Sequence, residues 1–394
     1  MANVSSSNGL EKRPKLRFPG FDEPYKQCRI GDIYAERSQR GASDMELLSV
    51  TMNDGVKPRS EIEGKDNSSE DKSNYKIVRK GDMVYNSMRM WQGANGISPC
   101  DGIVSPAYTV LMPKQEINNG YFAALFKSAN LINEFRKNSQ GMTSDTWNLK
   151  YPQIETIKVQ IPSVSEQDKV SELFGVLDAR IVAQAQLVES LKKYKRGVNN
   201  QILSQIDNSY NCRLGSVCEI VGGGTPDTLH IEYWGNTVEW FTPSEIGKTK
   251  YVNNSVRKLS DIGLNSSSAK LLPIGTVLLT TRATLGEMSI AKRECSTNQG
   301  FQSLIPHTDR VSSEYLYYMQ IIIKPWCEKY ASGNTFREIS KSALSDCIIP
   351  IPDRARQEQI VKLLSSIDML IGAAESISIS LSKIRHGLMQ QLFI

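Results

Sequence analysis

The segment GGGTPDT at residues 222–228 has the clearest appearance of chemistry in this chain of 394 residues. Three glycines followed by a threonine could leave backbone amides open to a phosphate group, as in nucleotide-binding loops. Such loops require a Lys-Ser or Lys-Thr pair directly after the glycines. Here Gly224 is followed by Thr225 and Pro226, and no lysine occurs before Lys248. The segment is therefore interpreted as a turn, and no nucleotide is expected on it.

Metal and catalytic chemistry find little support in the other polar residues. The seven cysteines are scattered and form no CxxC pair, so neither a zinc site nor a disulfide framework is expected. Asp54 with Glu63, Gly64 and Lys65 superficially resembles a nuclease cluster, but the flanking residues lack convincing strand cores. The Asn/Asp-Pro-Pro-aromatic signature of adenine methyltransferases is absent from the sequence. We expect no catalytic residue, no metal ion and no cofactor on this chain.

Length and composition favour a multidomain globular protein. The chain suits about two to four domains, and 40% hydrophobic with 23% charged residues is typical of globular cores. No apolar run approaches the roughly 18 residues of a membrane span. The first 20 residues contain no apolar signal core, so they are predicted to form a flexible leader and the protein to be cytoplasmic. The net charge of +5 permits DNA binding without requiring it.

The sequence contains an internal repeat of two similar halves, and this repeat determines the predicted architecture. In each half a glycine turn leads into an apolar strand, then small polar residues, an arginine and a second glycine turn; Arg89 aligns with Arg282, and Gly93 with Gly286. An aromatic helical segment and another glycine loop follow in each half. The matched pairs are CRIGDIYAE with CRLGSVCEI, KGDMVYNSMRMWQG (80–93) with IGTVLLTTRATLG (274–286), and SPAYTVLMP with NQGFQSLIP.

Both halves end in a long amphipathic segment. From Ile161 and Ile351 onward the two copies align without a gap at an offset of 190 residues, as helices with a fixed packing face require. Steps of three and four residues predict a coiled-coil seam, in helices of about 40 residues and roughly 60 Å. Lys195 and Arg385 occupy matching positions and could specify register or extend from the helix ends. The seam is predicted at Val170, Phe174, Leu177, Ile181, Leu191, Val198, Ile360, Leu364, Ile367, Ile371, Leu381 and Leu388.

The predicted fold class is α+β. Two similar mixed α/β domains in tandem would be separated and joined by two long helices, which an internal two-fold relation makes antiparallel. The predicted boundaries are a leader at 1–20, a first domain at 21–160, a first helical region at 161–208, a second domain at 209–350 and a second helical region at 351–394. Two globular domains at opposite ends of a helical rod would suit a reader of two DNA half-sites, because a rigid spacer fixes their separation.

Candidate DNA contacts lie at the strand ends and loops of both halves. Arginine can bind guanine or phosphate, glutamate can accept from cytosine, and small hydroxyl or amide side chains can reach base edges. Surface ion pairs, helix caps and core packing are the alternative roles of the same residues. For Trp147 and Trp240 core packing is favoured over base stacking. The candidates are Asn86, Ser87, Arg89, Thr143, Ser144, Ser244, Glu245, Thr280, Thr281, Arg282, Asn334, Thr335 and Arg337.

The ordered segments VGGGTPDT, YWGNTVEWFTPSEI, LPIGTVLLTTRATLG and STNQGF resemble the target recognition domain of type I restriction-modification specificity subunits. IPIPDRARQEQIVKLLSSIDMLI resembles the start of that family's helical regions. The resemblance runs from Arg13 to Ile394 and includes the duplication. The first half departs from it, with LLSVTMNDGV at 47–56 where the second has VEWFTPSEI. Such a departure fits two domains that read different sequences.

The resemblance implies a DNA-specificity subunit without catalysis of its own. Double-stranded DNA would be one partner, and two adenine-N6 methylation subunits, with restriction subunits joined through them, the others. S-adenosylmethionine, ATP and Mg²⁺ would then bind to the partner subunits. The alternatives are a nuclease or methyltransferase acting alone, a homodimeric DNA-binding or structural protein with coiled-coil dimerisation, and the specificity subunit of a related system that is not of type I.

Overall fold

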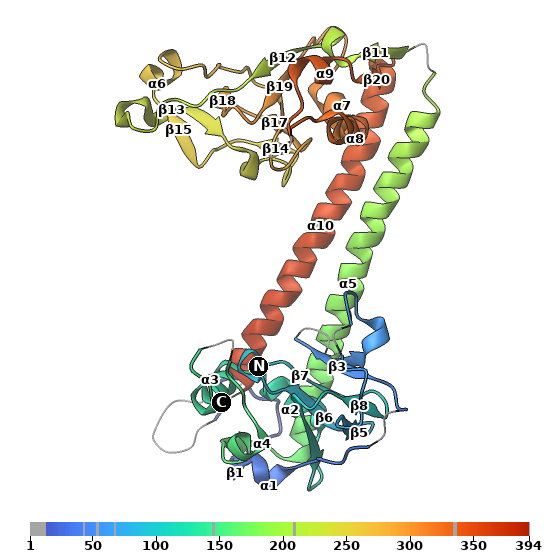
Figure 1. Cartoon of the computed structure of the whole chain (residues 1–394), viewed down its shortest axis with the longest axis vertical. Coiled ribbons are helices and arrows are strands. Elements are labelled where there is room, and N and C mark those ends of the chain that lie inside the picture. The colour runs from blue at the N-terminus through green and yellow to red at the C-terminus, as the bar shows by residue number, and fades with distance from the viewer. Residues whose placement is uncertain are drawn as a thin grey trace. The chain divides into compact units, whose positions relative to one another are not determined.

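The computed structural model describes residues 13–41, 44–52, 55–66, 68–143, 146–207, 210–333 and 337–393. The chain divides into two compact units, which we call unit 1 (residues 1–186 and 375–394) and unit 2 (residues 187–374). Each unit contains sheets, short helices and one segment of each of two long helices (Figure 1). The mixture of helices and sheets in both halves confirms the predicted α+β class. The five-part division of the chain stays a prediction.

Unit 1 contains four small antiparallel sheets, one of four strands in the order β2-β9-β6-β7 and three pairs, β1-β10, β3-β4 and β5-β8. Its elements are β1 (Lys26–Arg29), α1 (Ile30–Ile33), β2 (Tyr34–Glu36), β3 (Leu48–Thr51), β4 (Gly55–Pro58), η1 (Arg59–Glu61), β5 (Lys76–Val78), β6 (Met83–Asn86), η2 (Met90–Gln92), β7 (Asn95–Ile97), β8 (Gly102–Val104), β9 (Tyr108–Pro113), α2 (Asn119–Leu125), α3 (Ala129–Asn138), α4 (Tyr151–Ile154) and β10 (Lys158–Ile161), followed by α5 (Val164–Ser204).

Unit 2 contains a five-stranded sheet in the order β12-β19-β16-β17-β14, a three-stranded sheet β15-β13-β18 and the pair β11-β20. Its elements are β11 (Asn211–Arg213), η4 (Leu214–Ser216), β12 (Cys218–Gly222), η5 (Ile231–Tyr233), β13 (Trp234–Phe241), η6 (Pro243–Glu245), β14 (Tyr251–Val252), β15 (Arg257–Leu259), α6 (Asp261–Asn265), β16 (Val277–Leu279), β17 (Met288–Ala291), β18 (Cys295–Thr297), β19 (Gln302–Pro306), α7 (Ser313–Tyr318), α8 (Gln320–Tyr330), α9 (Lys341–Ser345) and β20 (Ile348–Pro350), followed by α10 (Arg354–Leu392).

The two long helices are α5 and α10, and they run antiparallel within each unit. In unit 1, Phe174 stacks on Phe393 at 5.7 Å between ring centroids, and Asp178 pairs with Arg385 at 2.5 Å. In unit 2, Lys195 pairs with Asp368 at 2.5 Å. The two ion pairs are copies of each other at the offset of 190 residues. Lys195 and Arg385 therefore bind acids of the opposite helix.

Every predicted seam residue is buried or half-buried, but not all of them face only the other helix. Val170 and Phe174 belong to the core of unit 1, together with the α2 and α3 aromatics and the end of α10. Ile360, Leu364, Ile367 and Ile371 belong in the same way to the core of unit 2. The first part of each helix is thus packed against its own sheet-and-helix body, and this tertiary packing of the apolar face stabilises the helix.

A buried glutamine joins each long helix to the body of its unit. Gln357 accepts a hydrogen bond from Ser312 N at 3.1 Å and donates to the carbonyl oxygens of Arg310 and Pro352 at 2.8 and 2.9 Å. Gln167, its counterpart in unit 1, accepts from Asn118 N and donates to Pro162 O, both at 3.0 Å. Both side chains are buried. These bonds satisfy backbone groups that would otherwise be buried without partners.

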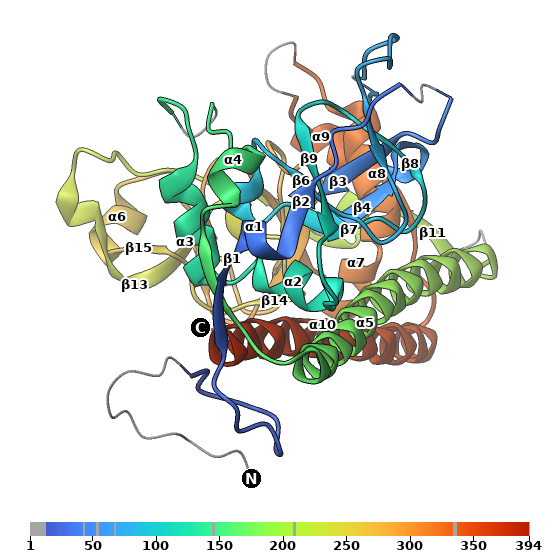
Figure 2. The same ribbon diagram turned by 90° about the horizontal axis from the view of Figure 1, so that it is seen from below.

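The end of the predicted flexible leader is docked on unit 1. Arg17 donates two hydrogen bonds, of 2.9 and 2.8 Å, to the buried carboxylate of Glu166 at the start of α5. Leu16 N donates to Gln391 O in α10 at 3.0 Å, and Leu16 and Phe18 pack on the core. Figure 2 shows this part of the chain, in blue, leading into β1. The prediction of a flexible leader is therefore corrected for residues 13–20, because two apolar side chains and a charged pair hold them.

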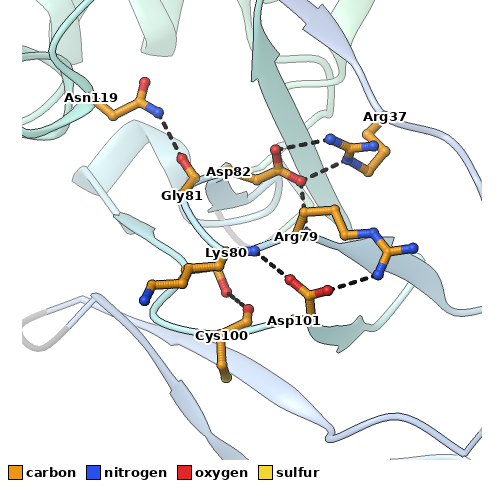
Figure 3. Close-up of polar contacts among 9 residues, drawn as sticks. Arg37, Arg79, Lys80, Gly81, Asp82, Cys100, Asp101 and Asn119 are labelled. Carbon is orange, nitrogen blue, oxygen red and sulfur yellow. Dashed lines mark hydrogen bonds and ion pairs between the residues drawn. The ribbon is translucent and has the colours of Figure 1, made fainter.

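The turn that precedes β6 is fixed by two carboxylates, as Figure 3 shows. Asp82 accepts from Arg37 Nε and Arg79 N at 2.7 and 2.8 Å, and Asp101 accepts from Arg79 and Lys80 N at 2.7 and 2.8 Å. Gly81 has a φ of +90°, and Gly275 before β16 has a φ of +87°, a region that favours glycine. The repeated glycine turn thus leads into the corresponding strand, β6 or β16, in each unit.

Candidate nucleic-acid interface

Gly223 and Gly224 allow two backbones to approach closely. A Cβ on Gly223 would lie 1.9 Å from Asn298 O, and one on Gly224 would lie 2.4 Å from Ala269 N. Gly224 N donates to Thr297 O at 2.9 Å, and its carbonyl accepts from Trp240 Nε1 at 3.0 Å. Close approach is therefore the reason for these glycines. Gly222 ends β12 and residues 223–227 form no turn, so the interpretation of this segment as a turn is wrong for these residues.

Several loops of unit 2 meet at this place. Thr281 N, at the start of the turn after β16, donates to Gly300 O at 2.8 Å. Asn298 N donates to Phe241 O at 3.1 Å, where β13 enters η6. The Thr284 hydroxyl donates to Pro243 O at 3.4 Å. We call the joined loops at 222–228, 242–246, 280–286 and 297–300 the loop cluster of unit 2.

Arg282 stands on the most constrained turn of this cluster. The next residue, Ala283, has a φ of +58° and is the only described non-glycine residue with a positive φ. Such a conformation costs about 1 kcal/mol or more and is concentrated at functional sites. The Arg282 guanidinium pairs with Glu338 at 2.8 Å while 43% of its side chain stays exposed. The ion pair holds the guanidinium and leaves part of it exposed to solvent.

The equivalent turn of unit 1 has different surroundings. Arg89 is exposed, and its guanidinium has no ion-pair partner among the described residues. Beside it, Trp91 packs edge-on against Trp147 at 5.2 Å, and the Arg136 guanidinium lies 5.5 Å from the Trp91 ring. Trp147 is half-buried, which fits the predicted packing role. Unit 1 therefore presents cations and aromatic rings where unit 2 presents an ion pair.

Three predicted contact residues are buried with their hydroxyls already bonded. The Ser87 hydroxyl is buried against Thr109 Oγ1 at 2.8 Å. Thr280 and Thr281 are fully buried, and their hydroxyls bind Thr284 O and Glu338. These three positions correct the sequence analysis, because polar residues at strand ends often complete the core rather than face solvent. Glu245 is half-buried and accepts from Thr242 N and Val256 N, both at 2.8 Å, and its role in DNA contact stays a prediction.

The remaining candidates are exposed, half-buried or outside the described residues. Asn86 is half-buried and accepts from Met88 N at 3.0 Å, and Ser244 is exposed, with Thr242 rather than Ser244 forming the cap of η6. Thr143 and Arg337 are exposed; Arg337 donates to Glu328 O. Three candidates lie outside the described residues: Ser144, Asn334 and Thr335.

A buried carboxylate in unit 2 has a structural explanation. Burial would raise the pKa of Glu239, but hydrogen bonds from Lys258 and Ser255 and the charge of Lys258 lower it below the ordinary value. Ser255 N and its hydroxyl donate to Glu239 at 2.7 and 2.8 Å, which fixes the connection into β15. There the exposed Arg257 guanidinium lies 3.4 Å from the centroid of the Trp234 ring. An arginine held flat in this way can contact a phosphate.

Among the described residues no group of three or more His, Cys, Asp or Glu side chains could hold a metal ion. None of the described helices is long and apolar enough to cross a membrane.

Sequence reasoning missed Thr225, Gln299 and Glu338. Thr225 donates a hydrogen bond to Gln299, 74 residues away, and Glu338 pairs with Arg282. The repeat offered a partial signal, because NQGFQSLIP aligns with SPAYTVLMP and the glutamine has no counterpart in unit 1. No local spacing joins these residues, so only the folded loops show that they are neighbours.

Comparison with known proteins gives a consistent family. The model of the type I restriction modification DNA specificity domain matches residues 23–208 and 206–381. A specificity subunit of the MjaIX enzyme of Methanocaldococcus jannaschii is 35% identical over 46% of this chain and 43% of that protein. The EcoR124I/EcoR124II specificity subunit of Escherichia coli is 26% identical over 54% of this chain and 56% of that one. The matched part thus spans about half the length of these relatives.

Solved structures share the fold at low sequence identity. A chain from a type I restriction-modification system studied for its assembly has a TM-score of 0.61 at 18% identity, covering 95% of this chain and 98% of that one. The HsdS subunit of Thermoanaerobacter tengcongensis has a TM-score of 0.51 at 18% identity, covering 96% and 98%. The type I S subunit of M. genitalium has a TM-score of 0.58 at 14% identity, covering 97% and 99%.

Proposed function

Because this chain belongs to the type I restriction modification DNA specificity family, we propose that it is the DNA-specificity subunit of a type I complex. It reads an asymmetric site in two parts, one half-site for each unit. The observation that carries this proposal is the repetition of one frame with different loops upon it. Buried Gln167 and Gln357 attach a long helix to the body of its unit in the same way. Arg89 and Arg282, in contrast, lie in different surroundings. Two similar scaffolds with unlike loops are what recognition of two unlike sequences requires.

The long helices offer the surface for protein partners in this proposal. Apolar side chains that a helix in water would normally bury are exposed along both, with Met369 69% and Val176 65% exposed. Exposed apolar patches on helices are typical of protein–protein contacts. The exposed set is Val176, Val182, Leu187 and Tyr194 on α5, and Leu363, Met369, Leu370, Ile377, Ile379 and Ile384 on α10. Two methylation subunits dock there, and restriction subunits join through them.

Catalysis belongs to these partners in the proposed complex. S-adenosylmethionine, ATP and Mg²⁺ bind to the methylation and restriction subunits, and this chain works in the cytoplasm. The relatives are named as specificity subunits of restriction enzymes, and this supports a recognition role without catalysis. Methylation then acts on an adenine that the partner flips out of the duplex in each half-site.

The test is a genome-wide map of N6-methyladenine in a host free of DNA methylation that expresses this chain with its methylation subunit. We expect an asymmetric motif of two short half-sites around a fixed gap. The matched variants Arg89→Ala and Arg282→Ala are expected to relax different half-sites. A symmetric motif would favour a dimer of a chain in which one unit reads DNA. No methylation from a stable complex with the partner would contradict the proposal and favour the structural alternative.

A further inference from the structure

We propose that Gln299 reads an adenine edge in the major groove of the half-site recognised by unit 2, with Thr225 as its positioning residue. This inference rests on the proposed function, and it names a base contact that the sequence analysis did not include. It concerns the loop at 297–300, between β18 and β19, within the loop cluster of unit 2.

The backbone of this loop is held on three sides. Asn298 N donates to Phe241 O at 3.1 Å, and the Asn298 side chain accepts from Gly300 N at 2.9 Å. Thr297 O accepts from Gly224 N at 2.9 Å, and Gly300 O from Thr281 N at 2.8 Å. A loop fixed at both of its ends and in its middle presents its exposed side chain from a defined position. That side chain is Gln299.

The Gln299 amide is also oriented. The hydroxyl of Thr225 donates to its Oε1, and both residues are exposed. A carbonyl oxygen of this kind accepts two hydrogen bonds, so one acceptor position stays open. The amide nitrogen of Gln299 has no partner among the described residues. The amide oxygen and the free donors belong to one planar group.

This pattern matches adenine. In the major groove adenine offers the N6 amino group as a donor and N7 as an acceptor, and a glutamine amide bonds to both at once. A neutral amide carries no charge to attract phosphate, so a base edge suits it better than the backbone. The aligned residue of unit 1 is Pro106, which has no polar side-chain group. The contact is therefore confined to one half-site.

Methylation mapping of the full chain with its methylation subunit, in the same methylation-free host, tests this inference. We expect Gln299→Ala to relax one adenine-containing position of one half-site, lowering discrimination there by roughly tenfold or more. Gln299→Glu should shift that position toward cytosine, because a carboxylate accepts from the cytosine amino group. Thr225→Val should cause a smaller loss of discrimination at the same position. Arg282→Ala should alter the same half-site, which identifies it as that of unit 2.

The matched control is Gln115→Ala, an exposed glutamine of unit 1, which should leave the whole motif unchanged. Thermal melting of each complex separates misfolding from altered reading. An unchanged motif in both folded Gln299 variants would overturn the inference and leave the proposed function intact. So would weaker methylation at every site without relaxation at any position, since that indicates a structural role. Absence of methylation by the unaltered complex would remove the proposed function and this inference together.

Discussion

Units 1 and 2 attach their long helices through the same contacts and present different loops. Gln167 and Gln357 are both buried and both bind the residue that leads into the aromatic helices, Asn118 and Ser312. The ion pairs Asp178–Arg385 and Lys195–Asp368 recur at the same offset. At the equivalent turns, however, Arg282 faces Glu338, whereas the residue that occupies the β-bridge position of Glu338 in unit 1 is Asn148.

The difference shows where the sequence is constrained. A buried amide must satisfy buried backbone groups, so a change there has a large energetic cost. An exposed loop has no such requirement once its ends are fixed, so its residues can differ without loss of the fold. Under the proposed function, duplication of one frame with divergent loops gives one chain two recognition units.

The comparison is most sharply tested at the glycines that only unit 2 contains. Gly223→Ala should destabilise unit 2 by about 3 kcal/mol or more, because the new Cβ would lie 1.9 Å from a backbone oxygen. Gly222→Ala is the matched control, since its Cβ would meet nothing nearer than 3.9 Å. Hydrogen exchange of β12 and β18 would measure both effects. Equal stability of the two variants would contradict the close-approach explanation.

The two buried glutamines are expected to differ in size of effect. Gln357→Ala removes three hydrogen bonds and Gln167→Ala removes two, so we expect losses of about 3 and about 2 kcal/mol. Urea denaturation followed by hydrogen exchange would assign each loss to its own unit. The exposed Gln359→Ala serves as the control. A larger loss of unfolding free energy for Gln167→Ala than for Gln357→Ala would contradict the explanation by the number of hydrogen bonds.

The duplicated ion pairs should be unequal for a similar reason. Asp368 also accepts from Tyr318 OH at 2.8 Å and is 28% exposed, whereas Asp178 is 51% exposed and, among the described residues, binds only Arg385. We expect Asp368→Ala to cost about 1.5 kcal/mol and Asp178→Ala about 0.5 kcal/mol. A double-mutant cycle with Tyr318→Phe would separate the hydroxyl contribution in unit 2. No coupling between these two residues would refute that assignment.

The smallest expected effect concerns the two turns that carry arginine. Glu338→Gln should raise DNA affinity about threefold, because it releases Arg282 and removes an acid near phosphate, and Asn148→Glu should lower it by a similar factor. Titration of the full chain with a duplex carrying the mapped motif, at fixed salt, measures both. Glu116→Gln, an exposed acid of unit 1, controls for net charge. If Glu338→Gln instead lowered the DNA affinity, Glu338 would orient Arg282 for its contact rather than compete for it.

Parts of this protein follow from sequence alone. The duplicated frame, the two long helices and the turns at Gly81 and Gly275 were all expected from sequence signals, namely a constant offset, steps of three and four residues, and repeated glycines. The last two signals act over a few residues of chain, where backbone sterics and helical period decide the structure.

The loop cluster of unit 2 could not be predicted from local sequence signals. Thr280 and Thr281 look like exposed polar residues in the sequence and are buried in the fold. Gln299 and Thr225 form one group although they are 74 positions apart in the sequence. Which hydroxyl completes the core and which amide stays free depends on how loops from distant strands pack together. The repeated sequence by itself determined the frame, because helical and turn preferences are local. Only tertiary packing, which is non-local, decided which loop side chains are buried and which are exposed.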